Sequence, residues 1–72
     1  MKDTYQRTHD FEMALDWVLR CQHKDNVSFR FTFETYRGFY RTPWMSPSQC
    51  LAYMRCTSSE FEFKTFTMRL CA

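Results

Sequence analysis

Glycine and proline are scarce in this chain, which has one glycine and two prolines among 72 residues. A loop that cradles a phosphate with its backbone needs several closely spaced glycines, so a nucleotide site of this kind is excluded. The low content of both residues and the formal net charge of only +2 also argue against a disordered chain. We therefore expect residues 1–72 to fold as one domain, because the chain is too short for two.

A long apolar run is missing as well. The first residues, Met1 to Arg7, are polar, which indicates no secretory signal. No apolar stretch approaches the roughly 20 residues that cross a bilayer. Cys71 is the penultimate residue, whereas a prenylation site needs its cysteine fourth from the end. The sequence therefore predicts a cytoplasmic protein.

Closely paired cysteines are also lacking. The four cysteines are Cys21, Cys50, Cys56 and Cys71, whereas structural zinc sites normally pair their ligands at spacings such as C-x-x-C. Only Cys21 and His23 are close in sequence. We expect reduced, mostly structural thiols, no metal ligands and no cofactor. A small structural zinc-binding protein is an alternative.

No arrangement typical of an enzyme is present. Nucleophilic catalysis needs a base positioned beside the nucleophile, and neither His9 nor His23 is obviously paired with a serine or cysteine. Glu60 and Glu62 fall on one face of an alternating segment and resemble solvated residues at a sheet edge. The prediction is therefore a non-enzymatic protein.

Aromatic residues are abundant: eight phenylalanines, four tyrosines and two tryptophans. In the segment 27–34, VSFRFTFE, every odd position is apolar and every even position is polar. This period of two is typical of a strand with one buried face. The following segment, 39–44, can fold back on it and form a hairpin around a loop in which Gly38 takes the left-handed conformation.

The expected register of this hairpin collects its large rings on the side of the helices. The opposed pairs on that side are Phe33 with Tyr40, Phe31 with Thr42, and Phe29 with Trp44. Phe39 is then the only ring of the hairpin on the other side. A slip of one residue would scatter the rings between the two faces.

Two helices are expected to flank the hairpin. Thr8 or Asp10 caps the first helix, which should run to about Lys24. The run Ser46-Pro47-Ser48-Gln49 combines a serine cap, a proline at the first helical position and a glutamine that completes a capping box. It predicts a second helix that ends at about Cys56.

The first helix has a wide apolar arc. Its core stripe is expected to contain Phe11, Ala14, Leu15, Val18 and Leu19. Met13, Trp17 and Cys21 form a second stripe beside it. Because packing on one sheet does not require so wide an arc, we expect Met13 and Trp17 to mediate self-association as a homodimer.

In the last segment, from Glu60 to Leu70, apolar and polar residues alternate, but the alternation changes phase. Phe61 and Phe63 occupy odd-numbered positions, whereas Phe66, Met68 and Leu70 occupy even-numbered ones. A bulge near Lys64 and Thr65 would give the strand a single buried face.

The fold class that follows is α+β, with a small antiparallel sheet packed on two helices in the order α-β-β-α-β. If Thr4 to Thr8 adds a short leading strand, the order becomes the ferredoxin-like β-α-β-β-α-β.

Arginine is concentrated in the middle of the chain. Residues 27–57 contain four arginines and, as their only acid, Glu34. Guanidinium groups suit bidentate contacts with carboxylates or phosphates. Arginine and aromatic residues are also enriched at the centres of protein interfaces, so a second protein is the expected partner. The predicted partner-binding residues are Arg30, Tyr36, Arg37, Phe39 and Arg41.

Nucleic acid is the alternative partner. Arg37-Gly38-Phe39, at the start of a third strand, is similar to the basic-glycine-aromatic signature of the RNA-recognition motif. In that family the stacking rings lie on the open sheet face, where the expected register leaves only Phe39. Binding of RNA or another single-stranded nucleic acid therefore ranks second. It would use Arg30, Arg37, Phe39 and Arg41.

The stretch 44–50, Trp-Met-Ser-Pro-Ser-Gln-Cys, lies between the aromatic hairpin and the last strand. It resembles small phage- or prophage-encoded accessory proteins, several of which follow a strand pair with a helix that starts hydroxyl-x-x-Gln/Glu-Cys. The resemblance covers about residues 29–70. It implies a protein that modulates a host protein by direct binding, as an inhibitor does.

Overall fold

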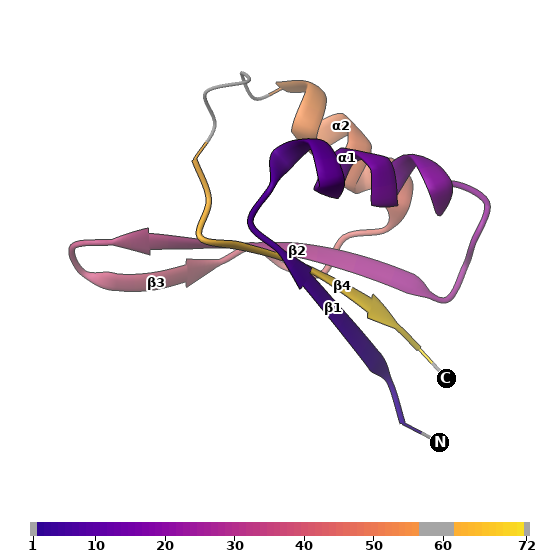
Figure 1. The fold of residues 1–72 in the computed structure, drawn as a ribbon, viewed down its shortest axis with the longest axis horizontal. Helices are drawn as coiled ribbons and strands as arrows, with labels where there is room; N and C mark the ends of the chain where they lie inside the picture. The colour runs from indigo at the N-terminus through magenta and orange to yellow at the C-terminus, as the bar shows by residue number, and fades with distance from the viewer. Residues whose placement is uncertain (1, 57–61, 72) are drawn as a thin grey trace.

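A four-stranded antiparallel sheet with both helices on one face makes up the computed structural model, which describes residues 2–56 and 62–71 (Figure 1). The strand order in the sheet is β1-β4-β2-β3. The predicted α+β class and the β-α-β-β-α-β order with a short leading strand are confirmed. The elements are β1 (Thr4–Thr8), α1 (Phe11–Arg20), β2 (Val27–Thr35), β3 (Gly38–Arg41), α2 (Pro47–Cys56) and β4 (Thr65–Leu70).

The odd-numbered residues of β2 from Val27 to Phe33 pack into the core, as their alternation predicts. Phe29 and Phe31 are fully buried, and they pair with Met68 and Phe66 on β4. The ring centroid of Phe31 lies 4.8 Å from that of Phe66 and 5.0 Å from that of Phe63. Aromatic pairs at such separations stabilise the fold beyond the area that they bury.

Both helices begin where the local signals predict. Asp10 caps α1 and accepts a hydrogen bond from the Glu12 N–H at 2.8 Å. At the start of α2 the Ser46 Oγ accepts from the Gln49 N–H at 3.3 Å, and the Gln49 Oε1 accepts from the Ser46 N–H at 3.0 Å. The capping box is therefore confirmed, and α2 ends at Cys56 as expected.

Helix α1 is shorter than predicted, because it ends at Arg20 and not at Lys24. The Cys21 N–H is shared between the carbonyls of Trp17 and Val18, at 3.1 and 3.2 Å. Such a contracted last turn closes a helix and satisfies its final carbonyls.

The buried arc of α1 is also narrower than the predicted core stripe. Ala14 and Val18 are fully buried, and Phe11 and Leu15 are partly buried. Leu19, however, is 47% exposed, so its assignment to the core is wrong. Successive helical residues are about 100° apart, which turns Leu19 away from an arc centred on Ala14 and Val18.

The β2–β3 hairpin has the predicted register as far as Thr42. Phe33 pairs with Tyr40, and Gly38 has a φ of +118°, which favours glycine. The Thr42 N–H donates to the Phe31 carbonyl at 3.0 Å, and the Thr42 Oγ1 accepts from the Phe31 N–H at 3.0 Å.

Beyond Thr42 the register slips by one residue. Phe29 exchanges two hydrogen bonds of 2.8 Å with Met45, so its predicted pairing with Trp44 is wrong. Pro43 has no N–H to donate to the ladder, which favours an irregular pairing at this point. The extra residue switches the face of the sheet to which the following side chains point. Trp44 therefore lies on the face opposite the helices.

Strand β4 begins at Thr65, directly after a bend at Lys64. The Lys64 N–H donates to the Thr32 carbonyl at 2.7 Å. Phe63 before the bend and Phe66 after it both pack into the core. The phase therefore changes at the predicted place, but the predicted bulge within the strand is wrong, because residues 62–64 precede the strand and the change comes from the bend. The expected strand residues Glu60 and Phe61 lie outside the described residues.

We expect Phe31→Ala to lower the free energy of unfolding by about 3–5 kcal/mol, because it leaves a cavity among the core rings. Tyr36→Ala is the control: Tyr36 is 93% exposed, and its loss should change stability by no more than about 0.5 kcal/mol. Urea unfolding followed by circular dichroism measures both. A loss below about 1 kcal/mol for Phe31→Ala would contradict this core.

Candidate binding face of the sheet

Both helices cover one face of the sheet (Figure 1). The opposite face is polar, basic and aromatic. On each strand the residues that alternate with the buried ones point to it, and Trp44 and Lys64 join them. This open face consists of Tyr5, Arg7, Ser28, Arg30, Thr32, Glu34, Phe39, Arg41, Trp44, Lys64, Thr65, Thr67 and Arg69.

The open face is more positively charged than the chain as a whole. Its five cationic side chains and one carboxylate give a formal charge of +4, against +2 for all 72 residues. Among residues 2–56 and 62–71, none of its four arginines has a carboxylate within ion-pair distance. Unpaired guanidinium groups gathered on one surface attract anionic ligands.

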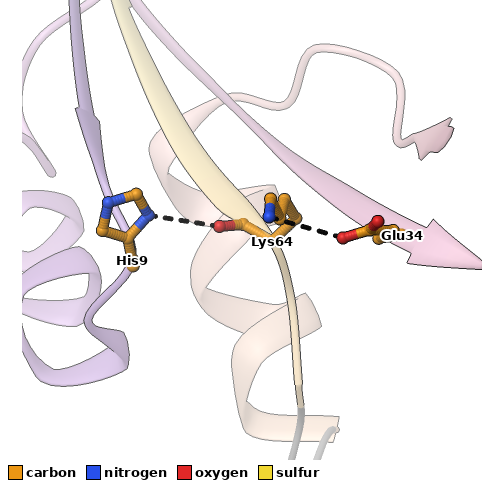
Figure 2. A network of polar contacts seen from close by, with 3 residues as sticks. All are labelled: His9, Glu34 and Lys64. Atoms are coloured by element: carbon orange, nitrogen blue, oxygen red, sulfur yellow. Dashed lines mark hydrogen bonds and ion pairs between the residues drawn. The ribbon is translucent and has the colours of Figure 1, made fainter.

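The single carboxylate belongs to a polar network at one edge of the open face (Figure 2). The Lys64 Nζ lies 3.4 Å from the Glu34 Oε2, and the His9 Nδ1 lies 3.3 Å from the Lys64 carbonyl oxygen. The network links β2, the bend before β4 and the turn that precedes α1. Both Lys64 and Glu34 are more than half exposed, so the ion pair contributes little to stability.

Trp44 packs against two arginines of the open face. The Cζ atoms of Arg30 and Arg69 each lie 4.3 Å from the tryptophan ring centroid, within cation–π range. The Arg30 Nε also donates to the Thr42 carbonyl at 3.1 Å. The Arg69 Nε is buried and has no hydrogen-bond partner in the described part of the chain. Trp44 therefore helps to hold together two guanidinium groups that repel each other.

Two further rings lie on the open face and remain accessible. The Tyr5 centroid lies 6.4 Å from that of Trp44, and the Arg7 Cζ lies 6.0 Å from the Tyr5 centroid. Tyr5 is 46% exposed, and Phe39, on β3, is 61% exposed. Both rings therefore offer apolar surface that a ligand can cover.

A depression of about 340 Å³ connects these groups. Thr32 and Thr67, which are buried, and the half-buried Thr65 form its floor. The rings of Tyr5, Phe39 and Trp44 line it together with Arg7, Arg30 and Arg41. Its volume lies at the lower end of the range of about 300–1,000 Å³ that small ligands occupy.

The structure brings together three of the five predicted partner-binding residues, because Arg30, Phe39 and Arg41 line the depression. Tyr36 and Arg37 lie instead in the hairpin turn, outside the depression. There the Arg37 Cζ lies 5.6 Å from the Tyr36 ring centroid.

Of the aromatic and cationic residues of the open face, sequence reasoning missed five: Tyr5, Arg7, Trp44, Lys64 and Arg69. It also missed the threonines of the depression, Thr32, Thr65 and Thr67. Alternation along the first and last strands could have found Tyr5, Arg7 and Arg69, since each alternates with residues of the other face. Trp44 could not be found in this way, because its side depends on the register slip at Pro43.

The predicted self-association residues have different surroundings. Met13 is 47% exposed, whereas Trp17 is partly buried, with its ring centroid 6.2 Å from that of Phe66. Trp17 thus contributes to the core, and the homodimer stays a prediction.

The four cysteines are free thiols that differ in exposure: Cys21 and Cys50 are buried, Cys71 is intermediate and Cys56 is exposed. Burial raises the pKa of the Cys50 thiol from 9.0 to about 12. Within residues 2–56 and 62–71, no three histidine, cysteine or acidic side chains are grouped so that they could hold a metal ion.

Comparison of the chain with known protein families, curated proteins and solved structures gives no match. No helix in residues 2–56 or 62–71 is long and apolar enough to cross a membrane. The resemblance to phage accessory proteins stays a prediction, and the geometry of the open face provides the argument for function.

The raised pKa of Cys50 predicts selective labelling. Because the thiolate is the reactive form, iodoacetamide at about pH 8 should modify Cys56 and leave Cys50 unmodified in the folded protein. In urea both should react, as peptide mass spectrometry can measure. Equal labelling of Cys50 and Cys56 without urea would contradict the buried position.

The same shift predicts a pH dependence of stability. Between pH 9.0 and about 12 the thiol of Cys50 ionises in the unfolded chain before it ionises in the folded protein, so the free energy of unfolding should fall as the pH rises.

A double-mutant cycle tests the contact between Trp44 and Arg69. We expect Trp44→Leu and Arg69→Met to show a coupling of about 0.5–1 kcal/mol in the free energy of unfolding. The control cycle combines Trp44→Leu with Arg41→Met, which alters an arginine of the same face, and should show no coupling. Denaturant unfolding measures both cycles, and an absence of coupling in the first would contradict the contact.

Proposed function

We propose that the protein binds single-stranded nucleic acid on the open face of its sheet. The observation that carries the proposal is the convergence of three rings and three arginines around one depression on the sheet face opposite α1 and α2. Among residues 2–56 and 62–71 these arginines have no carboxylate within ion-pair distance. Proteins that bind single strands combine a positive surface for the backbone with rings on which the bases stack.

The arginines supply the contact with the backbone. Arg7, Arg30 and Arg41 line the depression, and each can contact a phosphate with two parallel hydrogen bonds. The formal charge of +4 on this face supports attraction of a polyanion even though the whole chain carries only +2.

The accessible rings supply the contact with the bases. Trp44 is already packed against two guanidinium groups, so bases are expected to stack on Phe39 and Tyr5. These two rings stand on β3 and β1, the two edge strands of the sheet. A strand bound to both would cross the depression between them, as a ligand with exposed bases can do.

The position of Trp44 and Tyr5 changes the ranking of the two partner classes. A protein partner ranks first on the sequence because Phe39 is expected as the only ring on the open face. With Tyr5 and Trp44 on that face as well, the arrangement is closer to a stacking platform. A cytoplasmic location, which is still a prediction, would give the protein access to such a ligand.

A protein partner is the second candidate, and the exposed hairpin favours it. Tyr36, Phe39 and Tyr40 are 93%, 61% and 58% exposed, and the hairpin extends beyond the helices (Figure 1). Exposed tyrosines at a protruding turn suit an interface. In this function the chain would modulate a host protein through the turn, and Tyr36→Ala would weaken that contact without affecting nucleic acid.

Fluorescence anisotropy with a labelled single-stranded oligonucleotide tests the proposed function. Phe39→Ala should weaken binding by roughly fivefold to a hundredfold, the loss of one stacked base. Arg41→Gln should weaken it and reduce the slope of log affinity against log salt by about 0.7. Arg55→Gln, which removes the same charge from α2 on the other side of the sheet, is the matched control and should change neither value.

The two candidates give opposite results in this assay. If the wild-type protein fails to bind the oligonucleotide at low salt, the nucleic-acid proposal is wrong. If Arg55→Gln weakens binding as much as Arg41→Gln does, the site is not the open face.

A further inference from the structure

We infer that the open face selects RNA over DNA, because the floor of its depression presents three threonine hydroxyl groups to the ribose of a bound strand. This inference rests on the proposed function, since it concerns the ligand of the same site. Thr32 lies on β2, and Thr65 and Thr67 lie on β4, the two central strands of the sheet.

The strand register of the sheet places these threonines next to arginines. Thr32 lies between Arg41 on β3 and Thr65 on β4. In the next row of this face, Thr67 lies between Arg30 on β2 and Arg7 on β1. Directly opposed side chains have Cβ atoms about 4.5–5.5 Å apart, so each row places hydroxyl groups next to guanidinium groups. A nucleotide offers the matching pattern, a sugar hydroxyl next to a phosphate.

The three hydroxyl groups are free to bind a ligand. In the described part of the chain none of them makes a hydrogen bond, and none is a fully buried oxygen without a partner, so each keeps accessible surface on a residue that lines the depression. Other threonine hydroxyls are engaged within the protein. The Thr8 Oγ1 accepts from the Asp10 N–H, and the Thr35 Oγ1 donates to the Gly38 carbonyl.

The chemistry of these groups distinguishes the two nucleic acids. A threonine hydroxyl and a ribose 2′-hydroxyl can each donate and accept, so they can pair in either direction. DNA has only hydrogen at that position and would cover the threonine hydroxyls without pairing them. A site built to hydrogen-bond a hydroxyl discriminates against the analogue that lacks it, because polar groups are then left unsatisfied.

Two probes that differ only at the 2′ position test the inference. They are fluorescein-labelled oligouridine and oligodeoxyuridine of about ten nucleotides, which have the same bases and phosphates. We expect the wild-type protein to bind oligouridine roughly tenfold more tightly. The double variant Thr32→Val/Thr67→Val keeps branched side chains in the strands and removes two hydroxyls. It should bind oligouridine roughly threefold to tenfold more weakly and oligodeoxyuridine as the wild type does.

Thr4→Val is the matched control. It makes the same change on β1, on the side of the sheet that faces the helices, and should leave both affinities unchanged. Thermal unfolding followed by circular dichroism confirms that each variant is folded before its affinity is measured.

The outcomes separate this inference from the proposed function. Equal wild-type affinity for the two probes would overturn the inference and leave the proposed function standing. A loss in the double variant that is the same for both probes would overturn the role of the threonines. If neither probe binds, both the proposed function and the inference are overturned.

Discussion

The structure depends on the packing of the phenylalanines of one sheet face against two helices. Phe29, Phe31 and Phe66 are fully buried there. Their burial determines which side of β2 and β4 faces the helices. Because side chains alternate along a strand, burying the rings forces the charged residues of β1, β2 and β4 to the other face. The cationic open face is therefore a consequence of the core.

Trp44 shows how a local irregularity also decides which residues lie on the open face. In an unbroken register it would pack with Phe29 beneath the helices. The slip after Thr42 instead places Trp44 beside Arg30 and Arg69. There its ring stabilises two neighbouring cations that would otherwise repel each other. A residue expected to stabilise the core thus organises the surface, and it changes which ligand that surface suits.

The sequence predicts those features that short-range chemistry determines. The aspartate and serine caps, the alternation of β2 and the turn at Gly38 each depend on a few neighbouring residues, and each is confirmed. The side of Trp44 and the exposure of Leu19 depend instead on register and helix rotation, which tertiary packing decides. The sequence identified Arg30, Phe39 and Arg41, and alternation could have added residues of β1 and β4, but tertiary packing decides which strands lie side by side.

Nuclear magnetic resonance titration of the ¹⁵N-labelled protein with oligouridine shows whether a ligand binds the open face, because it locates the ligand residue by residue. We expect the largest amide shifts on strand residues around the depression, such as Arg30, Thr32 and Thr67, with α1 and α2 unchanged. Shifts confined to the helices, or to the hairpin turn at Tyr36 and Arg37, would contradict this expectation.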